Sequence, residues 1–371
     1  MKKTVAVALS GGLDSAIAAV LLKEQGYRVI GVHFQTGYEA TLDAPIPSKN
    51  SSLVHAKAQR AADQIGIPLE VMDCHQPFRR EVVDYFVHTY RSGQTPSPCL
   101  VCNERIKFGL VLEHAGALGA SAFATGHYVR IGREEGGGVS LLRGVDQGKD
   151  QSYFLARLTQ GQLSQAMFPL GSYRKDQVRD MAKARGFTSF VERESQELCF
   201  IRQPNYKEFL CTLAGFCCKP GAIVNPQGHV LGTHQGLHAY TVGQRRGIGI
   251  PGPEPYYVVR LDNEKNRLIV GTESDLARRE CVVVGINWIT RVPGKPLSVH
   301  TRIRYRHRQA ASVMTPLGSQ RAKVVFSEPQ LAITPGQAAV FYQGERVLGG
   351  GWIAATSAEE REGAEHSAHG T

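Results

Sequence analysis

The chain has 371 residues, 42% of them hydrophobic, and a formal net charge of +10 at pH 7. That length is sufficient for two or three domains with separate cores, and the composition is that of an ordinary globular protein, which excludes a fibrous or wholly disordered chain. No stretch approaches the roughly 18 unbroken apolar residues of a membrane helix. The chain enters a strand directly after Lys2-Lys3, so we expect neither membrane attachment nor a signal peptide, and a cytoplasmic location.

The positive charge and the cysteines narrow the possible partners. The last dozen residues carry several glutamates, so the basic excess lies in the body of the chain, and nucleic acid is the first partner to test. The chain has 8 cysteines and no secretion signal, which indicates thiol chemistry or metal binding rather than a disulfide framework.

The first predicted elements form an anion-binding loop. Residues 4–9 are an apolar, β-rich run, Ser10-Gly11-Gly12 is a glycine turn, and an apolar stretch continues to Gly26, a pattern typical of strand, tight loop and helix. The glycines let backbone N–H groups approach a ligand, and the helix start adds its positive dipole end. The serine hydroxyls, together with Asp14, which can hold Mg²⁺ or water, complete a site for a nucleotide phosphate.

This loop lacks the Gly-Lys-Ser/Thr ending of a Walker A motif, and no lysine lies within it to reach a γ-phosphate. Ser10-Gly11-Gly12-Leu13-Asp14-Ser15 resembles instead the pyrophosphate loop of the N-type ATP pyrophosphatases. The resemblance implies cleavage of ATP between the α- and β-phosphates and activation of an oxygen as its adenylate.

Short apolar runs and amphipathic stretches alternate to about residue 200, which favours a doubly wound parallel sheet covered by helices. Strands are predicted at residues 27–34, 69–72 and 122–125, helices at 53–65, 79–90, 103–118 and 175–185, a hairpin tip at 133–138, and an aperiodic loop at 38–52. The loops after Leu9, Phe34 and Thr125 share the carboxyl edge of the sheet, where ligands bind. Phe34 either flanks an adenine ring or belongs to the core.

After residue 203, glycine-punctuated β runs replace the helices, which favours one or two small antiparallel barrels or sandwiches. The predicted class is therefore α/β, with a catalytic domain at 1–203, a small β-rich middle domain at 204–278, a C-terminal β-barrel at 279–355 and a flexible tail at 356–371.

A basic segment lies inside the predicted barrel. Strand alternation in residues 300–308 places on one face His300, Arg302, Arg304, Arg306 and Arg308. Such a face is long enough to follow several phosphates of a nucleic acid. The alternative is the charged, solvated face of an edge strand.

A Cys-x-x-Cys pair, Cys99 and Cys102, follows a proline-stiffened loop at the start of a predicted helix. The helix dipole and nearby basic side chains are expected to lower the thiol pKa, so that thiolate is accessible near neutral pH. A structural zinc site needs a second pair of ligands, for which the adjacent Cys217-Cys218 is poorly placed, and a thioredoxin-type dithiol is usual in a smaller domain. Beside an ATP-adenylating loop, sulfur transfer through a persulfide is the favoured function.

Long blocks in one order resemble the tRNA-specific 2-thiouridylases over nearly the whole chain. Besides the glycine loop they are Thr95-Pro96-x-Pro98 with Cys102-Asn103-x-x-Ile106-Lys107-Phe108, Ala124-Thr125-Gly126-His127-Tyr128, Lys149-Asp150-Gln151-Ser152-Tyr153-Phe154, Ser195-Gln196-x-x-Cys199-Phe200-Ile201 and Tyr240-Thr241-Val242-Gly243-Gln244-Arg245-Arg246-Gly247. The resemblance implies an adenine nucleotide α-hydrolase-like fold and a tRNA-uridine 2-sulfurtransferase. Such an enzyme adenylates O2 of the wobble uridine of certain tRNAs and replaces that oxygen by sulfur.

The resemblance also implies the site residues. The nucleophile falls on Cys102 and the persulfide-bearing cysteine on Cys199. The ATP contacts fall on Ala8, Leu9, Ser10, Gly11, Gly12, Leu13, Asp14, Ser15, Phe34 and Gly126. Contacts to the target base fall on Ser97, Pro98 and Cys99, and other tRNA contacts on His127, Lys149, Asp150, Gln151, Arg304, Tyr305 and Gln337.

The implied cofactors are ATP and Mg²⁺, and the implied partners are tRNA and a sulfur-donor protein, either a cysteine desulfurase or a relay carrier. The family pattern often has an aspartate, credited with acid–base help, where this chain has Cys99, and a thiol cannot simply substitute for it. Cys99, Cys102 and Cys199 also suit a [4Fe–4S] cluster whose open iron binds sulfide. Both sulfur routes stay open.

Two other functions compete with thiolation. One is a pyrophosphate-loop synthetase acting on a small metabolite, which explains neither the cysteines nor the basic segment. The other is a tRNA-binding or cluster-carrying protein without catalysis, which leaves Asp14 unused.

Overall fold

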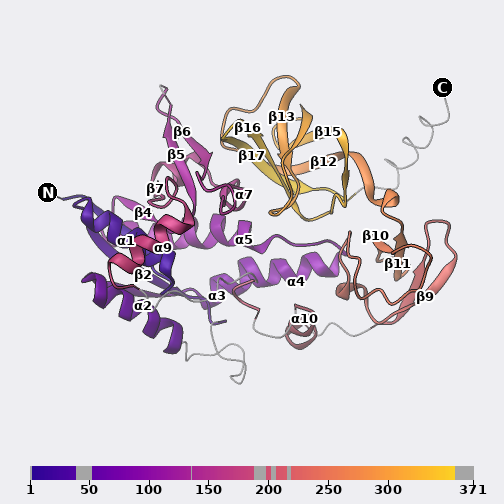
Figure 1. The fold of residues 1–371 in the computed structure, drawn as a ribbon, viewed down its shortest axis with the longest axis horizontal. Coiled ribbons are helices and arrows are strands. Elements are labelled where there is room, and N and C mark those ends of the chain that lie inside the picture. The colour runs from indigo at the N-terminus through magenta and orange to yellow at the C-terminus, as the bar shows by residue number, and fades with distance from the viewer. Residues whose placement is uncertain are drawn as a thin grey trace. The chain divides into compact units, whose positions relative to one another are not determined.

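The computed structural model describes residues 2–38, 52–134, 136–187, 198–201, 206–214 and 219–355. The predicted 38–52 loop falls almost entirely outside these residues, as do Cys217 and Cys218. Contacts divide the chain into two compact units, one of residues 1–85, 98–209 and 343–348 and one of residues 86–97, 210–342 and 349–371. Figure 1 labels the helices and strands of both units.

The first unit contains a parallel sheet in the order β3-β2-β1-β4-β7. Its strands are β1 (Thr4–Ala8), β2 (Arg28–Gln35), β3 (Leu69–Asp73), β4 (Ala122–Ala124) and the two-residue β7 (Ala166–Met167). From β1 the chain builds outward to β3 on one side and then to β7 on the other, so the topological switch point lies between β1 and β4. The predicted doubly wound sheet is confirmed.

The helices of this half of the chain follow the predicted pattern with two irregularities. They are α1 (Leu13–Glu24), α2 (Ser52–Ile65), α3 (His75–Phe78), η1 (Arg79–Val83), α4 (Asp84–Arg91), α5 (Pro98–Val101), η2 (Cys102–Val111), α6 (Leu112–Ala117), α7 (Ser152–Leu155), α8 (Gln160–Ser164), α9 (Lys175–Ala184) and α10 (Tyr206–Ala214). The segments η1 and η2 are π-helical, a form that is frequent at functional sites. The predicted hairpin is formed by β5 (Val129–Arg133) and β6 (Val139–Arg143).

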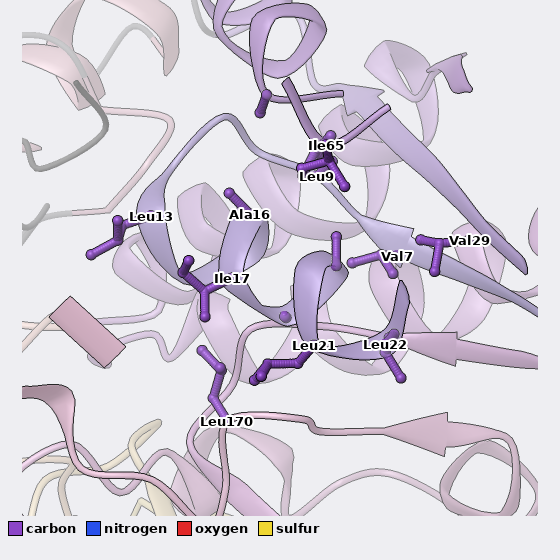
Figure 2. Close-up of a cluster of buried hydrophobic side chains, with 14 of the residues drawn as sticks. Val7, Leu9, Leu13, Ala16, Ile17, Leu21, Leu22, Val29, Ile65 and Leu170 are labelled. Atoms are coloured by element: carbon purple, nitrogen blue, oxygen red, sulfur yellow. The ribbon is translucent and has the colours of Figure 1, made fainter. Parts of the chain in front are cut away.

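The core of the sheet region is built around α1, whose apolar residues face almost every direction. Figure 2 shows Leu13, Ile17 and Leu21 of α1 among side chains from the strands and from Leu170. Because Ala16 and Ala18 leave little bulk on the helix, it packs closely against its neighbours, including α9. The loop that precedes α1 therefore stands on a rigid helix.

The second unit contains two β structures. The first is a sheet in the order β10-β11-β8-β9, formed by β8 (Gly221–Val224), β9 (Val230–His234), β10 (Tyr257–Asp262) and β11 (Arg267–Gly271), with the short η4 (Leu237–Ala239) after β9. Its core holds Ile223, Val258 and Leu268. Strands β8 and β11 run parallel, so the prediction of purely antiparallel pairing is wrong for this pair.

The second β structure is a closed barrel that follows η5 (Ser274–Leu276). Its strands are β12 (Ala277–Trp288), β13 (Leu297–Arg302), β14 (Ala310–Pro316), β15 (Arg321–Leu331), β16 (Ala338–Gln343) and β17 (Arg346–Ile353). They pair in the order β12-β15-β14-β13-β16-β17, and β12 pairs with β17 to close the ring. Arg346 and Val347, which belong to the first unit, pair with Leu142 and Leu141 of β6.

These elements confirm the α/β class with a β-rich middle region and a C-terminal barrel. Within the described ranges, no helix combines the length and the apolar character that crossing a bilayer requires.

Candidate active site

The glycine loop joins the end of β1 to the start of α1. The N-cap of α1 is Gly12, which has no side chain to accept a hydrogen bond, so N–H groups of the first turn are presented to a ligand. Ser15 Oγ donates to the Gly12 carbonyl at 2.9 Å and lies 3.3 Å from the Ser10 N–H, which donates to it. These bonds hold the turn in an anion-binding shape.

Two glycines allow close backbone approaches around this loop. Gly11 has φ +76°, and a Cβ there would lie 2.7 Å from Lys57 Cβ and 2.8 Å from the Ala58 nitrogen of α2. Gly126, after β4, lies so close to α1 that a Cβ would be 2.8 Å from the Asp14 carbonyl carbon. The loop is thus clamped between α2 and the end of β4, at the switch point of the sheet.

Asp14 has partners that the sequence did not indicate. Both its carboxylate oxygens accept hydrogen bonds from Lys175 Nζ, at 2.7 and 2.8 Å, and Oδ1 also accepts one from the Tyr128 hydroxyl at 2.8 Å. In this structure the Asp14 carboxylate is bound by both side chains, and its role in holding Mg²⁺ or water stays a prediction. Neither Lys175 nor Tyr128 was predicted as a site residue, and no local pattern marks either of them.

Three predicted sulfur residues lie within electrostatic range of one another. Cys99 is the second residue of α5 and Cys102 is the first residue of η2. Cys199 is exposed. The thiolate forms of Cys99 and Cys199 both raise the pKa of Cys102. A further thiol, Cys74, acts on Cys102 in the same way, and no pattern in the sequence singles it out.

Aromatic packing fixes the place of Cys199. The next residue, Phe200, is buried and packs edge-on against Phe78 and Phe209, with ring centroids 5.8 and 5.5 Å apart. Tyr38 joins the same cluster, 6.3 Å from Phe200. The exposed thiol is therefore attached to a segment anchored in the core.

Cys74 lies at the same edge of the sheet as the glycine loop. Cys74 directly follows β3, and its N–H donates to the Gln35 carbonyl at the end of β2 at 2.8 Å. Strand β3 stands two places from β1, a separation of about 10 Å at the usual strand spacing. Cys74, which is coupled electrostatically to Cys102, therefore lies at the edge of the sheet that carries the glycine loop.

The acidity of the two helix-start thiols contradicts the prediction. Burial raises the pKa of Cys99 to about 11 and that of Cys102 to about 12, and the neighbouring thiols add to this effect. Lys107 opposes the shift but does not overcome it. Desolvation of the charged form outweighs the helix dipole, so in the free protein both thiols are neutral near pH 7.

The cysteines do not form a ready ligand set for an iron–sulfur cluster. In the part of the chain that the structure describes, no three His, Cys, Asp or Glu side chains converge closely enough to hold a metal ion. A cluster needs thiolate ligands that point at one centre. The arrangement of these residues therefore does not fit an iron–sulfur cluster.

Phe34 and His127 lie at the carboxyl edge, as predicted. Phe34 is half-buried near the end of β2, and its contact with an adenine ring stays a prediction. His127 shares a 2.8 Å hydrogen bond with Thr125 Oγ1 and packs beside the rings of Phe108 and Phe168, with its ring centroid 6.4 Å from each of theirs. Burial and the charge of Lys107 hold the pKa of His127 well below its usual range, so its imidazole is neutral.

Asp150 and Gln151, two of the three predicted RNA contacts at 149–151, form hydrogen bonds within the protein. Asp150 is buried and accepts hydrogen bonds from the Gly144 and Ser152 N–H groups at 3.2 and 3.1 Å. Gln151 Oε1 accepts the Tyr128 N–H at 2.9 Å. Both side chains shape the turn beside the loop, while Lys149 is half-buried. Direct contacts of these residues with RNA stay predictions.

Gln337 is tied to the segment that leads to the cysteines. Its Nε2 donates to the carbonyls of Thr95 and Pro96, at 3.3 and 2.9 Å. The same segment receives a second anchor, because the Thr95 N–H donates to the Pro335 carbonyl at 2.9 Å. Ser97, which follows, is buried, and Pro98 is the first residue of α5. Gln337 therefore acts at least as a support for the predicted base-contacting segment.

The prediction of a long arginine strand is wrong. Strand β13 ends at Arg302, and residues 303–309 form bends and a turn. Arg302 Nε donates to the His307 carbonyl at 3.1 Å, and Arg304 donates to the carbonyls of Val242 and Ala332 at 2.9 and 2.7 Å. These two guanidinium groups hold the turn together, whereas Arg306 and Arg308 are exposed.

Replacement of Arg304 tests whether its side chain stabilises the fold. We expect Arg304→Met to lower the free energy of unfolding by about 2 kcal/mol, since buried carbonyls lose charged donors. Arg308→Met, at an exposed position of the same turn, should stay within about 0.5 kcal/mol of the parent protein. Urea denaturation measures both. An unchanged stability of Arg304→Met would show that the side chain is not needed by the fold.

A parallel sheet with a Ser-Gly-Gly loop at a helix N-terminus, beside the switch point of the sheet, is the arrangement of a pyrophosphate-loop domain. Three family models match the chain in succession: "tRNA methyl transferase HUP domain" at residues 3–203, "tRNA methyl transferase PRC-barrel domain" at 207–272 and "Aminomethyltransferase beta-barrel domain" at 278–353. Two similar proteins, both named tRNA-specific 2-thiouridylase MnmA, come from Geobacter metallireducens and Moorella thermoacetica. The first is 45% identical over 96% of this chain and 98% of its own, and the second is 46% identical over 94% and 98%. The chain belongs to the tRNA-specific 2-thiouridylase family, a family of sulfurtransferase enzymes.

Proposed function

We propose that this protein catalyses ATP-dependent 2-thiolation of the wobble uridine of tRNA, giving 2-thiouridine, AMP and pyrophosphate. The observation that best supports this is the electrostatic coupling of Cys102 to Cys99, Cys199 and Cys74, the last of which directly follows β3 of the sheet that carries the glycine loop. An enzyme that only coupled small molecules through an adenylate has no need of several thiols there. The names of the relatives supply the substrate.

The first half-reaction uses the loop of residues 8–15, with Phe34 and Gly126 completing the nucleotide site. The N–H groups at the start of α1 and the hydroxyls of Ser10 and Ser15 bind the phosphates. Uridine O2 attacks the α-phosphorus, and pyrophosphate leaves. Mg²⁺ would be held by the phosphates and Asp14. A single carboxylate is sufficient when the nucleotide supplies the other ligands. The bound Mg²⁺ would neutralise charge on the phosphates.

The second half-reaction moves sulfur onto the activated base. The terminal sulfur of a persulfide on Cys199 attacks C2, and AMP leaves with the former O2. The thiolate of Cys102 then attacks the Cys199 sulfur of the resulting C2–S–S link, which releases 2-thiouridine and leaves a Cys102–Cys199 disulfide. An external reductant and a sulfur-donor protein, a desulfurase or a relay carrier, restore the persulfide.

The resolving step is expected to accelerate with pH. The pKa of Cys102 is raised to about 12 in the free protein, so the fraction of thiolate grows about tenfold per pH unit well below that value. Single-turnover release of 2-thiouridine from the persulfide form, followed by rapid quench between pH 7 and 9, should rise accordingly, whereas AMP formation should not. A flat profile for thiouridine release would contradict a resolving step that requires deprotonation of Cys102.

The other parts of the proposal follow the sequence. We propose catalytic, middle, barrel and tail regions at 1–203, 204–278, 279–355 and 356–371, and a cytoplasmic location. The proposed RNA contacts are Ser97, Pro98, Cys99, His127, Lys149, Asp150, Gln151, Arg304, Tyr305 and Gln337. The persulfide route is preferred to a [4Fe–4S] route because the thiols do not converge on one point in the described chain. Anaerobically purified protein should be colourless, iron-free and active.

The experiment that tests the function is release of AMP and pyrophosphate from ATP with and without added tRNA. Dependence on tRNA, with mass-spectrometric detection of 2-thiouridine in the digested RNA, supports the proposal. AMP release that needs a small metabolite but no tRNA would identify a synthetase. Tight tRNA binding without any AMP would identify a binding protein.

A further inference from the structure

The side chain of Lys175 is an unusual component of the nucleotide site. Lys175 is the first residue of α9, its side chain is only 10% exposed, and it binds both oxygens of Asp14 from 161 positions away in the chain. Its own N–H donates to Asp146 Oδ2 at 2.9 Å, which fixes the start of the helix. The pair is partly buried, with the Asp14 side chain 35% exposed, and such pairs contribute little to stability, so its location beside the loop points to a functional role.

The electrostatics of the loop supply that reason. The segment from Ser10 to Ser15 contains no basic residue, and its one charged side chain is the carboxylate of Asp14. A bare carboxylate on the first turn of α1 would repel the polyphosphate that the same turn is shaped to bind. Lys175 cancels this charge, and the Tyr128 hydroxyl, which lies 2.8 Å from Asp14 Oδ1, holds the carboxylate in place.

Lys175 also holds its ammonium group beside the helix end that is expected to bind the phosphates. Its Nζ lies 2.7 Å from a side chain of the first turn of α1 and 5.7 Å from the centre of the Tyr128 ring. A modest rotation about its four-carbon stem moves the ammonium group from Asp14 to an anion at that helix end. It would then do what the lysine of a Walker A loop does from within the loop.

We propose that Lys175 is the cation of the phosphate loop: it neutralises Asp14 in the empty site and binds the terminal phosphates of ATP, and hence the departing pyrophosphate, in the loaded site. This inference rests on the proposed binding of ATP at residues 8–15. It adds a residue that stabilises charge on the leaving group.

The test compares ATP with AMP, which lacks the terminal phosphates. In calorimetric titrations, Lys175→Met should weaken ATP binding at least about 30-fold and AMP binding less than about 3-fold. Lys183→Met is the matched control, because Lys183 lies on the same helix with a side chain that is 66% exposed, and it should bind both nucleotides like the parent. Equal losses for ATP and AMP, or none, would overturn the inference.

A second pair of variants guards against misfolding, since Lys175→Met leaves Asp14 without its cation. Asp14→Asn removes that charge, so Asp14→Asn and the double variant Asp14→Asn/Lys175→Met are compared by the same titration after circular dichroism. If Lys175 binds phosphate, the double variant should bind ATP at least about 10-fold more weakly than Asp14→Asn. Equal affinities would mean that Lys175 serves only Asp14. Failure of the parent protein to bind ATP would instead refute the proposed function itself.

Discussion

The Cys199→Ser protein is expected to form no 2-thiouridine while still converting ATP to AMP in the presence of tRNA. Serine cannot carry a persulfide, but it leaves the glycine loop and the start of α1 untouched. We expect a loss of thiolation of at least about 1,000-fold, as is usual when a covalent catalytic group is removed. Mass spectrometry of tRNA nucleosides and a radiolabelled AMP assay measure the two half-reactions separately.

The Cys102→Ser protein should fail at a later step. Without the resolving thiol, the C2–S–S link between the base and Cys199 persists, so a covalent tRNA–protein complex should accumulate and dissociate when dithiothreitol is added.

The control for both variants is Cys281→Ser. Cys281 lies on β12, outside the segments that carry the glycine loop and the proposed sulfur residues. Loss of thiolation in Cys281→Ser, or normal thiolation in Cys102→Ser, would contradict the assignment of the sulfur residues.

Local patterns were sufficient to predict the parts of the site that are contiguous in sequence. The strand, the glycine turn and α1 follow one another in a single stretch, and their apolar residues identify a buried strand and helix without tertiary information. The Cys-x-x-Cys at the start of a helical segment was visible for the same reason. What such patterns could not give is the effect of burial on the thiols, because desolvation depends on residues from elsewhere in the chain.

Contacts between distant residues account for most of what was missed. The pairing of Asp14 with Lys175 spans 161 residues, and no periodicity in α9 distinguishes Lys175 from a surface lysine. The prediction for the basic segment was wrong for a different reason: alternation continues to Arg308 in the sequence, but the chain turns after Arg302, where guanidinium groups bind backbone carbonyls. Alternation describes a strand only if the backbone stays extended.

The last strand of the barrel, β17, could not be predicted from the sequence because of its glycines. Residues 349–351 are all glycine, which is unfavourable in an isolated strand. In the structure a Cβ on Gly351 would lie 2.6 Å from the Val284 carbonyl oxygen, and one on Gly349 would lie 2.3 Å from that of Asn287. The glycines thus permit the close approach of β17 to β12 that closes the ring, a constraint that exists only once the barrel has formed.

Replacement of Gly126 by alanine should disable the nucleotide site more than it harms the fold. The new Cβ would stand 2.8 Å from the Asp14 carbonyl carbon and 3.0 Å from the Ser15 nitrogen. These are backbone atoms at the start of α1, and they cannot swing aside as a flexible side chain would. Either α1 or the end of β4 must shift, at a cost of about 1–3 kcal/mol in the free energy of unfolding.

The shift falls on the N–H groups that are proposed to bind phosphate, so ATP affinity should fall about 100-fold, because a displacement well below 1 Å spoils several charge-assisted hydrogen bonds at once. Gly116→Ala is the matched control: Gly116 lies inside α6, and a Cβ there meets nothing within 4 Å. That variant should keep its ATP affinity and gain up to about 1 kcal/mol of stability from helix propensity. Calorimetric titration with ATP and urea denaturation measure the two effects. If Gly126→Ala bound ATP as tightly as Gly116→Ala, the nucleotide would have to bind away from the switch point between β1 and β4.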